Sequence, residues 1–448
     1  MVGGGYVGLV TSACLAELGH QVRCLESDRN KLNLLRSGNM PIHEPQLAEL
    51  WNKHSVSGRL AVTDDPGAAL SLANFVFIAV GTPQSGNGSA DLSYVESAIR
   101  TVVEFSDMAR VICIKSTVPP GTCARIQHDI RRKTGDQQGW TVVSNPEFLS
   151  QGRAVQDFLN PDRIVVGSSS EAISSSVAEL YAALNAPVVI TDSTGSELVK
   201  YASNSFLAMK ISFINEISRL CEVTGTDVGS VAAGMGLDSR IGGKFLEAGL
   251  GWGGSCFPKD TAALERLMDD AGIGHDLITA TRSVNTEQVN HIVQKIESMV
   301  DVADQPSVAV LGLTFKAGTD DLRGSQAIPL IEQLLQAGYT VRTYDPINPA
   351  LSPDIARRVT RCSSLDEALM GSSAMVISTA WPELISMDFA AAGKLMRSRV
   401  VVDARRVLDP GLFKDLGFSY YRPGDGRQLV GAAASGIASG TEMEQVAA

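Results

Sequence analysis

Cys256 lies in a glycine turn that is followed by Pro-Lys-Asp, in the segment GGSCFPKD of residues 253–260. Its thiol can act as a covalent nucleophile toward an aldehyde. The thiohemiacetal that forms can lose a hydride, which leaves a thioester for water to hydrolyse. An enzyme that oxidises an alcohol through an aldehyde to an acid needs such a covalent intermediate. The alternative is a small buried cysteine that only packs in a turn.

Two polar residues, Lys200 and Asn204, stand four positions apart in a segment with helical spacing. Residues at this spacing share one face of a helix. An ammonium and a carboxamide placed side by side can stabilise an alkoxide or a thiohemiacetal oxyanion, although the same pattern is typical of a solvated helix face. Asp260 follows Cys256 by four residues and can act as a base or orient a water molecule.

Two further polar residues follow predicted strands, Thr117 in KSTVPPGT and Glu147 in NPEFL. Open α/β sheets bind their ligands at this end of their strands. The sequence therefore predicts that both residues belong to the same site.

The glycines Gly3, Gly5 and Gly8 fit a dinucleotide-binding loop, in which they turn the chain, admit a pyrophosphate and let a helix pack on a strand. Glu26 ends the next predicted strand, at the usual distance for binding a ribose hydroxyl. The alternative is a glycine-rich turn with a surface acid. Only Met1 and Val2 precede Gly3, so we expect that the central first strand is missing and that the recorded start lies several residues late.

The composition restricts the class of protein. A chain of 448 residues, 44% of them hydrophobic, is long enough for two or three domains. A net charge of −11 disfavours nucleic acid and anionic membranes as partners and favours a small molecule. The 7 cysteines form no CxxC pair, which argues against a disulfide framework or a zinc site. Without a long apolar run or a signal peptide, a soluble cytoplasmic protein is expected.

The order of apolar segments predicts the architecture. Buried strands alternate with helices in the first 190 residues, at 22–26, 74–80, 110–116, 140–144 and 163–167, as in a parallel doubly wound sheet. Residues 193–224 lack proline and predict one long helix. A second alternating pattern begins at 307 with strands near 307–313, 339–346, 375–379 and 399–404.

The predicted fold is therefore α/β, with two Rossmann-like doubly wound domains joined by a long central helix and a helical dimerisation region. The expected domains are residues 1–190 for the cofactor, 191–300 as the central helical domain, and 301–425 as the second nucleotide-binding domain. The tail at 426–448 is rich in Ala, Ser and Gly and is expected to be disordered.

Several motifs together resemble the nucleotide-sugar 6-dehydrogenases, also called the UDP-glucose/GDP-mannose dehydrogenase family. They occur in the family's order: GGGYVGLV, FIAVGTP, KSTVPPGT, NPEFL, KYASNSFLAMKISFINE, SRIGGKFLEAGLGWGGSCFPKD, LGLTFKAGTDDLR and DARRVLDP. The match extends from the first residues to about residue 424. The segment KFLEAGLGWGGSCFPKD resembles the UDP-glucose branch, whereas the GDP-mannose enzymes usually carry Leu after the cysteine.

This resemblance implies a four-electron reaction in which UDP-glucose, two NAD+ and water give UDP-glucuronate and two NADH. It implies that Cys256 forms the thiohemiacetal and thioester. Lys200 and Asn204 would stabilise the oxyanion, and Asp260 would act with water as the base. Glu147 and Thr117 would hold the water for thioester hydrolysis. No metal is implied.

The resemblance also implies ligand-binding residues and a homodimer or higher homo-oligomer. For NAD they are Gly3, Gly5, Tyr6, Val7, Gly8, Glu26, Lys31, Thr82, Thr117, Glu147, Cys256, Lys259 and Arg323. For the sugar nucleotide they are Glu147, Phe148, Leu149, Lys200, Asn204, Arg240, Phe245, Gly253, Phe315, Lys316 and Arg405. Among these, Arg240 would reach the phosphates bound to a neighbouring subunit.

Two positions depart from the family pattern. Gln151 replaces a usual glutamate four residues after Glu147, and Gly324 replaces a glutamate after Leu-Arg. Three alternatives stay open at this point: a GDP-mannose or UDP-N-acetylhexosamine dehydrogenase, a simple two-electron hydroxyacid dehydrogenase, and a non-catalytic nucleotide-sugar-binding protein.

Overall fold

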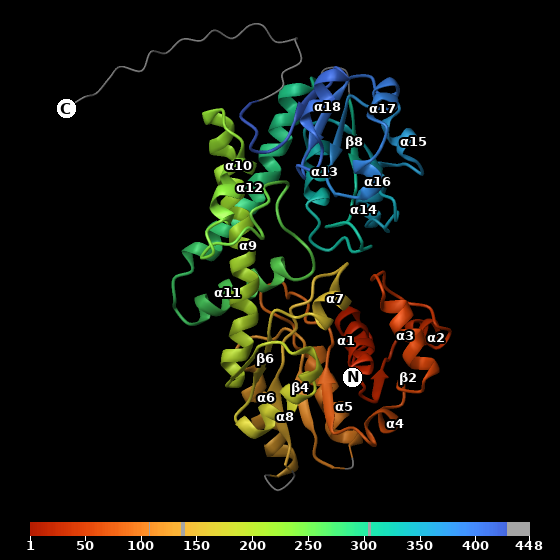
Figure 1. The fold of residues 1–448 in the computed structure, drawn as a ribbon, viewed down its shortest axis with the longest axis vertical. Helices are drawn as coiled ribbons and strands as arrows, with labels where there is room; N and C mark the ends of the chain where they lie inside the picture. The colour runs from red at the N-terminus through yellow and green to blue at the C-terminus, as the bar shows by residue number, and fades with distance from the viewer. Residues whose placement is uncertain (107, 136–138, 303–305, 428–448) are drawn as a thin grey trace, which may run out of the picture. The chain divides into compact units, whose positions relative to one another are not determined.

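The computed structural model describes residues 1–106, 108–135, 139–302 and 306–427 (Figure 1). The chain forms two compact units. Unit 1 comprises Met1–Phe213, Trp252–Thr286 and Thr314–Ser325, and unit 2 comprises Ile214–Gly251, Glu287–Leu313 and the chain from Gln326 onward. Most of the tail that was predicted to be disordered, residues 428–448, lies outside the described residues.

Unit 1 contains a largely parallel sheet with the strand order β3-β4-β5-β6-β7, together with the pair β1-β2. The strands are β1 (Val22–Leu25), β2 (Leu60–Thr63), β3 (Phe75–Ile78), β4 (Val111–Ile114), β5 (Thr141–Ser144), β6 (Ile164–Gly167) and β7 (Val188–Thr191). Strands β1, β3, β4, β5 and β6 confirm the predicted segments. Strands β2 and β7 were missed. Only Leu60 is buried in β2 and no residue is buried in β7, so neither is a buried apolar run like the other strands.

The missing first strand is reduced to one residue in the structure. Val2 forms parallel bridges with Leu25 of β1 and Ile78 of β3. Its amide donates to the carbonyl of Phe77 at 2.7 Å, and its carbonyl accepts from the amide of Ala79 at 2.9 Å. Val2 therefore occupies the position between β1 and β3 through isolated bridges, and the described residues contain no strand before helix α1 (Tyr6–Glu17).

One pairing differs from a fully parallel sheet. Strand β6 runs antiparallel to β5, through the single pair Ser144 and Gly167, whereas β6 and β7 are parallel. Apolar segments show where strands lie but not their direction, so the sequence pattern alone could not reveal this reversal.

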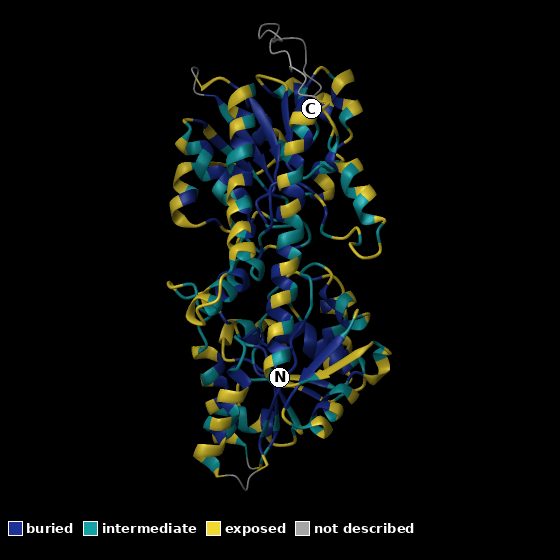
Figure 2. Ribbon diagram, turned by 90° about the vertical axis from the view of Figure 1, so that its left-hand side faces the viewer, coloured by how far each residue is buried: buried dark blue, intermediate teal, exposed yellow. Residues whose placement is uncertain are grey.

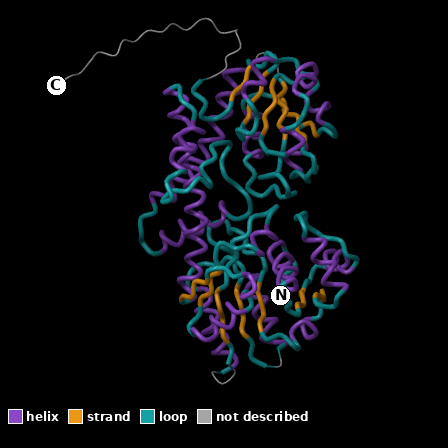
Figure 3. Tube along the Cα trace, viewed as in Figure 1, coloured by secondary structure: helices purple, strands orange, loops and turns teal. Residues whose placement is uncertain are grey.

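Helices cover both faces of this sheet, which confirms the doubly wound arrangement of unit 1 (Figure 3). Phe77, Cys113 and Val143 point into one apolar cluster, and their neighbours Ile78 and Ile112 point into the other. The helices of this unit are α1 (Tyr6–Glu17), α2 (Arg29–Arg36), α3 (Leu47–Val56), α4 (Pro66–Leu70), α5 (Ser93–Phe105), α6 (Thr122–Thr134), α7 (Ala154–Leu159), α8 (Glu171–Glu179), the 3-10 turn η2 (Ala182–Leu184) and α11 (Phe257–Asp270).

Two long helices pass from one unit into the other along the chain. Helix α9 (Ser193–Thr224) has 32 residues and confirms the predicted long helix, since no proline interrupts it. It belongs to unit 1 as far as Phe213, and helix α12 (Asp276–Met299) belongs to unit 1 as far as Thr286. Lys200 and Asn204 are buried on α9, whereas Leu198 and Phe206 are exposed.

Unit 2 contains a second parallel sheet, with the strand order β10-β9-β8-β11-β12-β13. Three of its strands, β8, β11 and β12, are buried (Figure 2), as the second predicted Rossmann-like pattern requires. The elements of this unit are α10 (Val228–Gly236), β8 (Ser307–Leu311), α13 (Ala327–Gln336), β9 (Thr340–Tyr344), α14 (Pro353–Arg358), β10 (Thr360–Arg361), α15 (Leu365–Leu369), β11 (Ala374–Ile377), α16 (Pro382–Ile385), α17 (Phe389–Leu395), β12 (Val400–Asp403), α18 (Pro410–Asp415) and β13 (Ser419–Tyr421).

Candidate active site

Cys256 caps the N-terminus of helix α11 in unit 1, directly after the glycine turn. The helix brings Asp260 one turn on, and its amide donates to the carbonyl of Cys256 at 2.9 Å. Asp260 is buried and binds two partners. The side-chain carboxamide of Asn204 donates to its carboxylate at 2.6 Å, and the ammonium nitrogen of Lys259 lies 2.5 Å from the carboxylate. The structure thus brings four predicted site residues together at the start of α11.

Lys200 lies one turn before Asn204 on α9 and forms an ion pair with Glu147. The ammonium nitrogen is 3.1 Å from the carboxylate, and both side chains are at most 7% exposed. The pair joins α9 to the loop that follows β5. Because Lys200 and Asn204 are both buried, the alternative of a solvated helix face is wrong.

The charges around Cys256 act on its thiol in opposite directions. Burial raises the pKa of Cys256, as do the carboxylates of Glu147 and Asp260, and the ammonium groups of Lys200 and Lys259 only partly offset this. The thiol is therefore protonated in the resting state. A base or a bound ligand must shift this balance before the sulfur attacks.

Lys200 and Glu147 each shift the pKa of the other toward the charged form. Burial disfavours ionisation of both groups, but Glu147 and then Cys256 and Asp260 raise the pKa of Lys200 above its ordinary value. Lys200 in turn holds the pKa of Glu147 below its ordinary value despite burial. Both groups are charged at neutral pH, as an oxyanion-stabilising cation and a proton acceptor require.

Thr117 is held between two other elements. The hydroxyl of Thr82 donates to the carbonyl of Thr117 at 2.9 Å, and both residues are buried. Farther along the same loop, the carboxylate of Glu197 on α9 accepts from the amides of Gly121 at 2.6 Å and Cys123 at 2.7 Å. Glu197 was not predicted, although its position three residues before Lys200 is a signal that it shares the same helix face.

The packing of the N-terminal turn requires glycine at two of its positions. A Cβ atom on Gly3 would approach the carbonyl oxygen of Ala79 to 2.7 Å, and Gly3 has a φ of +106°, so only glycine fits. A Cβ on Gly8 would lie 1.9 Å from the carbonyl oxygen of Gly3, whereas one on Gly5 would meet nothing within 4 Å. Gly5 also caps the N-terminus of α1, where free amides and the helix dipole favour a phosphate.

Glu26 and Tyr6 hold the backbone around this turn. One carboxylate oxygen of Glu26 accepts from the amide of Gly4 at 3.0 Å and the other from Asp28 at 2.7 Å. The hydroxyl of Tyr6 binds Glu44, and the amide of Gly152 donates to that hydroxyl at 3.0 Å. Among the other predicted cofactor residues, Val7 lies in α1 beside this turn and Lys31 in the first turn of α2.

The loop after Glu147 contains two predicted substrate residues. The amide of Leu149 donates to Glu147 at 2.5 Å, so the loop turns back on the carboxylate of Glu147. The ring of Phe148 packs against the guanidinium of Arg163 at 3.6 Å and lies 5.2 Å from the ammonium of Lys200.

The segment Thr314–Ser325 packs on the glycine turn before Cys256, and both belong to unit 1. A Cβ on Gly253 would lie 1.9 Å from the carbonyl oxygen of Gly324, and one on Gly254 would lie 3.0 Å from the ring of Phe315. Burial lowers the pKa of Lys316, and Cys256 is among the groups that act on it electrostatically. Phe315 and Lys316 thus lie near the turn that carries the nucleophile.

The two departures from the family pattern have structural reasons in this segment. The amide of Gln151 donates to Asp321 at 3.0 Å, and Arg323 binds the same carboxylate at 2.6 Å, so a glutamate at 151 would face a second anion. Gly324 has a φ of +63°, and a Cβ there would lie 2.7 Å from the carbonyl oxygen of Gly254. The tight packing therefore leaves no room for a glutamate at 324.

Three predicted substrate residues belong to unit 2. Arg240 is exposed and pairs with Asp238 at 2.6 Å. Phe245 has a left-handed backbone with a φ of 67°. The guanidinium of Arg405 donates to the carbonyls of Ser378 at 2.7 Å and Gly251 at 3.2 Å. Their roles in binding stay predictions.

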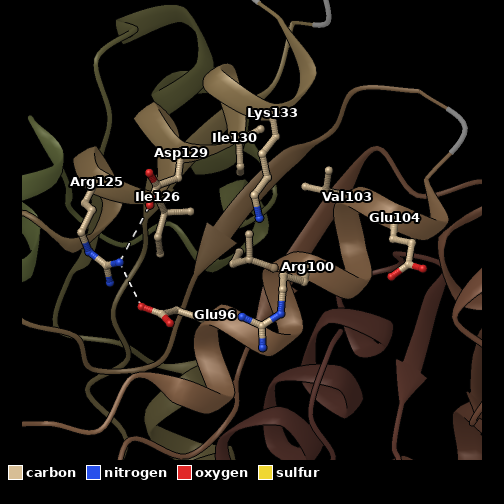
Figure 4. Close-up of a pocket in the computed structure, with 10 residues that line it drawn as sticks. Glu96, Arg100, Val103, Glu104, Arg125, Ile126, Asp129, Ile130 and Lys133 are labelled. Atoms are coloured by element: carbon tan, nitrogen blue, oxygen red, sulfur yellow. Dashed lines mark hydrogen bonds and ion pairs between the residues drawn. The ribbon is translucent and has the colours of Figure 1, made fainter.

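A cavity of about 400 Å³ lies between α5 and α6 (Figure 4). Arg125 in its wall pairs with Glu96 at 2.9 Å, and Ile99 and Ile126 contribute apolar surface. No residue predicted for the reaction lines this cavity. Within the described parts of the chain, no group of three or more His, Cys, Asp and Glu side chains could hold a metal ion, and no helix is long and apolar enough to cross a membrane.

Comparison with known proteins accounts for this arrangement. Three models of the UDP-glucose/GDP-mannose dehydrogenase family match the chain: the NAD binding domain at residues 1–185, the central domain at 194–287 and the UDP binding domain at 309–410. The UDP-glucose 6-dehydrogenase TuaD of Bacillus subtilis is 41% identical over 425 residues, which cover 95% of this chain and 92% of that protein.

Solved structures agree with the family models. A UDP-glucose dehydrogenase from Pyrobaculum islandicum is 38% identical, with a TM-score of 0.84 over 91% of this chain and 93% of that one. A UDP-D-ManNAc dehydrogenase from Pyrococcus horikoshii is 29% identical, with a TM-score of 0.84 over 95% and 99% of the two chains. The chain therefore belongs to the UDP-glucose/GDP-mannose dehydrogenase family and is a dehydrogenase that uses NAD.

Proposed function

We propose that the protein oxidises UDP-glucose to UDP-glucuronate, with the sugar held on Cys256 as a thiohemiacetal and then as a thioester. One observation carries this proposal. The thiol lies in a buried group of ionisable residues in which Lys200 pairs with Glu147 at 3.1 Å and Asn204 binds Asp260 at 2.6 Å. Relatives that carry the name UDP-glucose 6-dehydrogenase support UDP-glucose as the substrate.

The first oxidation requires a base for the hydroxyl proton of the sugar. Asp260 takes this role through a water molecule, because its carboxylate is buried and is already held by Asn204 and Lys259. NAD+ supplies the hydride acceptor for this oxidation and for the second one.

The covalent stage uses Cys256 and its neighbouring cations. The Cys256 thiol gives its proton to water, and the thiolate sulfur bonds to the aldehyde carbon, whose carbonyl oxygen becomes an oxyanion that Lys200 and Asn204 stabilise. The ammonium contributes charge and the carboxamide a directed N–H. Oxidation of the thiohemiacetal leaves the acyl group on sulfur as a thioester.

Hydrolysis then releases the acid. Glu147 and Thr117 hold a water molecule, whose oxygen bonds to the thioester carbon while its proton passes to Glu147. The carbon–sulfur bond breaks, and the sulfur leaves with the electron pair as the Cys256 thiolate. The ionised state of Glu147, which the Lys200 ammonium supports, suits this role.

Binding roles follow the same proposal. We assign NAD to the N-terminal turn, with Glu26, Lys31, Thr82, Lys259 and Arg323 as further ligands, and the sugar nucleotide to the predicted substrate residues. The domain limits at 190, 300 and 425 also remain a proposal. For a homodimer, the exposed side chains of Leu198, Phe206 and Phe213 offer an apolar face on α9, since their spacing of eight and seven residues keeps them on one side.

The decisive experiment is to incubate the protein with NAD+ and UDP-glucose and count the NADH formed per sugar consumed. Two NADH support the proposal. One NADH would indicate a simple two-electron dehydrogenase, and none would indicate another substrate or a binding protein. GDP-mannose and UDP-N-acetylmannosamine are the comparison substrates, because the family includes the first and the similar Pyrococcus horikoshii structure is described as acting on the second.

A further inference from the structure

Lys115 is a buried cation next to the site, and the proposed reaction gives it no role. It follows β4 directly and is only 5% exposed. Its ammonium donates to the carbonyl oxygen of Asn145 at 3.3 Å and to the side-chain oxygen of the same residue at 3.2 Å. A buried ammonium is costly unless it is paired, so its retention calls for a physical reason.

Asn145 is held on all sides. Its side-chain oxygen also accepts from the hydroxyl of Tyr181 at 2.7 Å, and its side-chain nitrogen donates to the carbonyl of Val165 at 2.8 Å. Its own amide donates to the carbonyl of Ile114 at 2.9 Å. These bonds fix the chain two residues before Glu147, and Lys115 is the charged member of the network.

Four ionisable groups face Lys115 from the elements packed around it: Glu147 after β5, Cys113 on β4, Lys200 on α9, and Tyr181, whose ring centroid is 5.7 Å from the ammonium nitrogen. Burial lowers the pKa of Lys115 to about 8, and Glu147 opposes this shift. In the other direction, Lys115 acts together with Lys200 to lower the pKa of Glu147. Glu147 therefore interacts with two ammonium groups.

The two cations differ in what else they bind. Lys200 is the group that must turn toward the substrate oxygen when the oxyanion forms, which weakens its interaction with Glu147. A buried carboxylate that loses its only cation takes up a proton, and a protonated Glu147 cannot accept the proton of the attacking water. Lys115 keeps its place, because Asn145 holds it.

We propose that Lys115 is a positioning residue for thioester hydrolysis, which keeps Glu147 ionised and its loop in place while Lys200 is bound to the substrate oxygen. This inference rests on the proposed function, since it assumes that Glu147 holds the hydrolytic water. It concerns only the last step of the reaction.

The kinetic test compares Lys115→Met, which removes the charge and the donor at similar volume, with Lys115→Gln, which keeps an N–H donor. The exposed Lys133 provides the control Lys133→Met in the same unit. For both Lys115 variants we expect a burst of two NADH per active site at a rate close to that of the wild type. Steady-state turnover should then be slower by about tenfold or more, with a covalent sugar adduct visible by intact-mass analysis.

Two results would overturn the inference: wild-type turnover without an adduct in either folded variant, or an equal loss in the first hydride step, which would indicate a general structural role. A second measurement does not depend on the substrate. Infrared difference spectra can follow the carboxylate band of Glu147, identified by its absence in Glu147→Gln. Removal of the nearby cation must raise the pH at which this band titrates in Lys115→Met.

The two measurements separate the possible failures. If the wild type forms no NADH from UDP-glucose, the proposed function fails, and the infrared titration still decides whether Lys115 controls Glu147. An unchanged titration in Lys115→Met would overturn the inference even if the wild type forms two NADH.

Discussion

The ammonium of Lys200 lies 3.1 Å from the carboxylate of Glu147, and both side chains are buried. The two residues are far apart in the sequence, one on helix α9 and the other in the loop after β5. Their contact joins the predicted oxyanion-stabilising group to the predicted water-binding group. Each side chain keeps the other charged, so a change in one must affect both.

This relationship predicts an unequal double-mutant cycle. Lys200→Met should lower the free energy of unfolding by about 3–5 kcal/mol, because it removes the direct ion-pair partner of the buried Glu147 carboxylate. Adding Glu147→Gln to Lys200→Met should recover most of that stability, since the carboxylate that lost this partner is then neutral, while kcat stays low by about 10²-fold or more. Urea unfolding and steady-state kinetics on the four proteins would measure this. If the losses of unfolding free energy in Lys200→Met and Glu147→Gln were equal, and the loss in the double variant were their sum, the coupling would be contradicted.

Replacement of the nucleophile should stop net turnover. Cys256→Ser should reduce kcat by roughly 10³-fold or more, because a hydroxyl is a poorer nucleophile and an ester is a poorer acyl donor than a thioester. Cys362→Ser changes a buried cysteine of unit 2 and serves as the matched control. NADH formation in both variants is the measurement, and normal turnover of Cys256→Ser would refute the covalent mechanism.

Gln151→Glu should destabilise the protein near neutral pH. The amide of Gln151 donates to Asp321, and an ionised glutamate would replace this donor with a second anion, at a cost of about 1–3 kcal/mol. This loss of stability should be smaller at pH 5, where the carboxyl of the introduced glutamate can take up a proton and donate a hydrogen bond to Asp321. Thermal unfolding at both pH values tests this, and Gln151→Glu combined with Asp321→Asn should be less destabilised than Gln151→Glu alone.

The buried carboxyl of Glu222 in unit 2 should make the stability of the fold depend on pH. Burial alone would raise the pKa of Glu222, but His291, the amide of Gly424 and Lys295 together lower it to about 2. A carboxyl whose pKa is lower in the folded state stabilises the fold above its unfolded value of 4.5, and this contribution is lost as the pH falls toward 2.

Glu222→Gln should therefore lower the free energy of unfolding at pH 7 by up to about 3 kcal/mol. The difference from the wild type should narrow steadily below pH 4.5. Urea unfolding of both proteins from pH 7 to pH 3.5 would show this, and a difference that is independent of pH would contradict the assignment.

The local sequence pattern was sufficient for much of the fold. An uninterrupted helical spacing from 193 to 224 predicted the whole of α9, and apolar runs marked the buried strands of both sheets. The four-residue spacing of Lys200 and Asn204 and that of Cys256 and Asp260 placed each pair on one helix turn. Such features depend on neighbours in the chain, which is why they can be read without a structure.

Contacts between distant segments could not be obtained in this way. The order of the strands brings the end of β4 beside the end of β5, which is how Lys115 meets Asn145. The antiparallel pairing of β5 with β6, the closure of the sheet by Val2 alone, and the fit of Gly324 against Gly254 depend on the same long-range packing.

The sequence by itself thus determined most of the helices and strands and indicated the candidate nucleophile with the groups next to it along each helix, because hydrophobic period and spacing act locally. Only the tertiary structure decided which charges face one another. The energy of a buried ion depends on the partners that the fold brings within a few ångströms, and those partners are separated by many residues in the chain. For this reason Lys115 was not predicted, and the only signal for Glu197 was its position three residues before Lys200, although both hold the loops that carry the site.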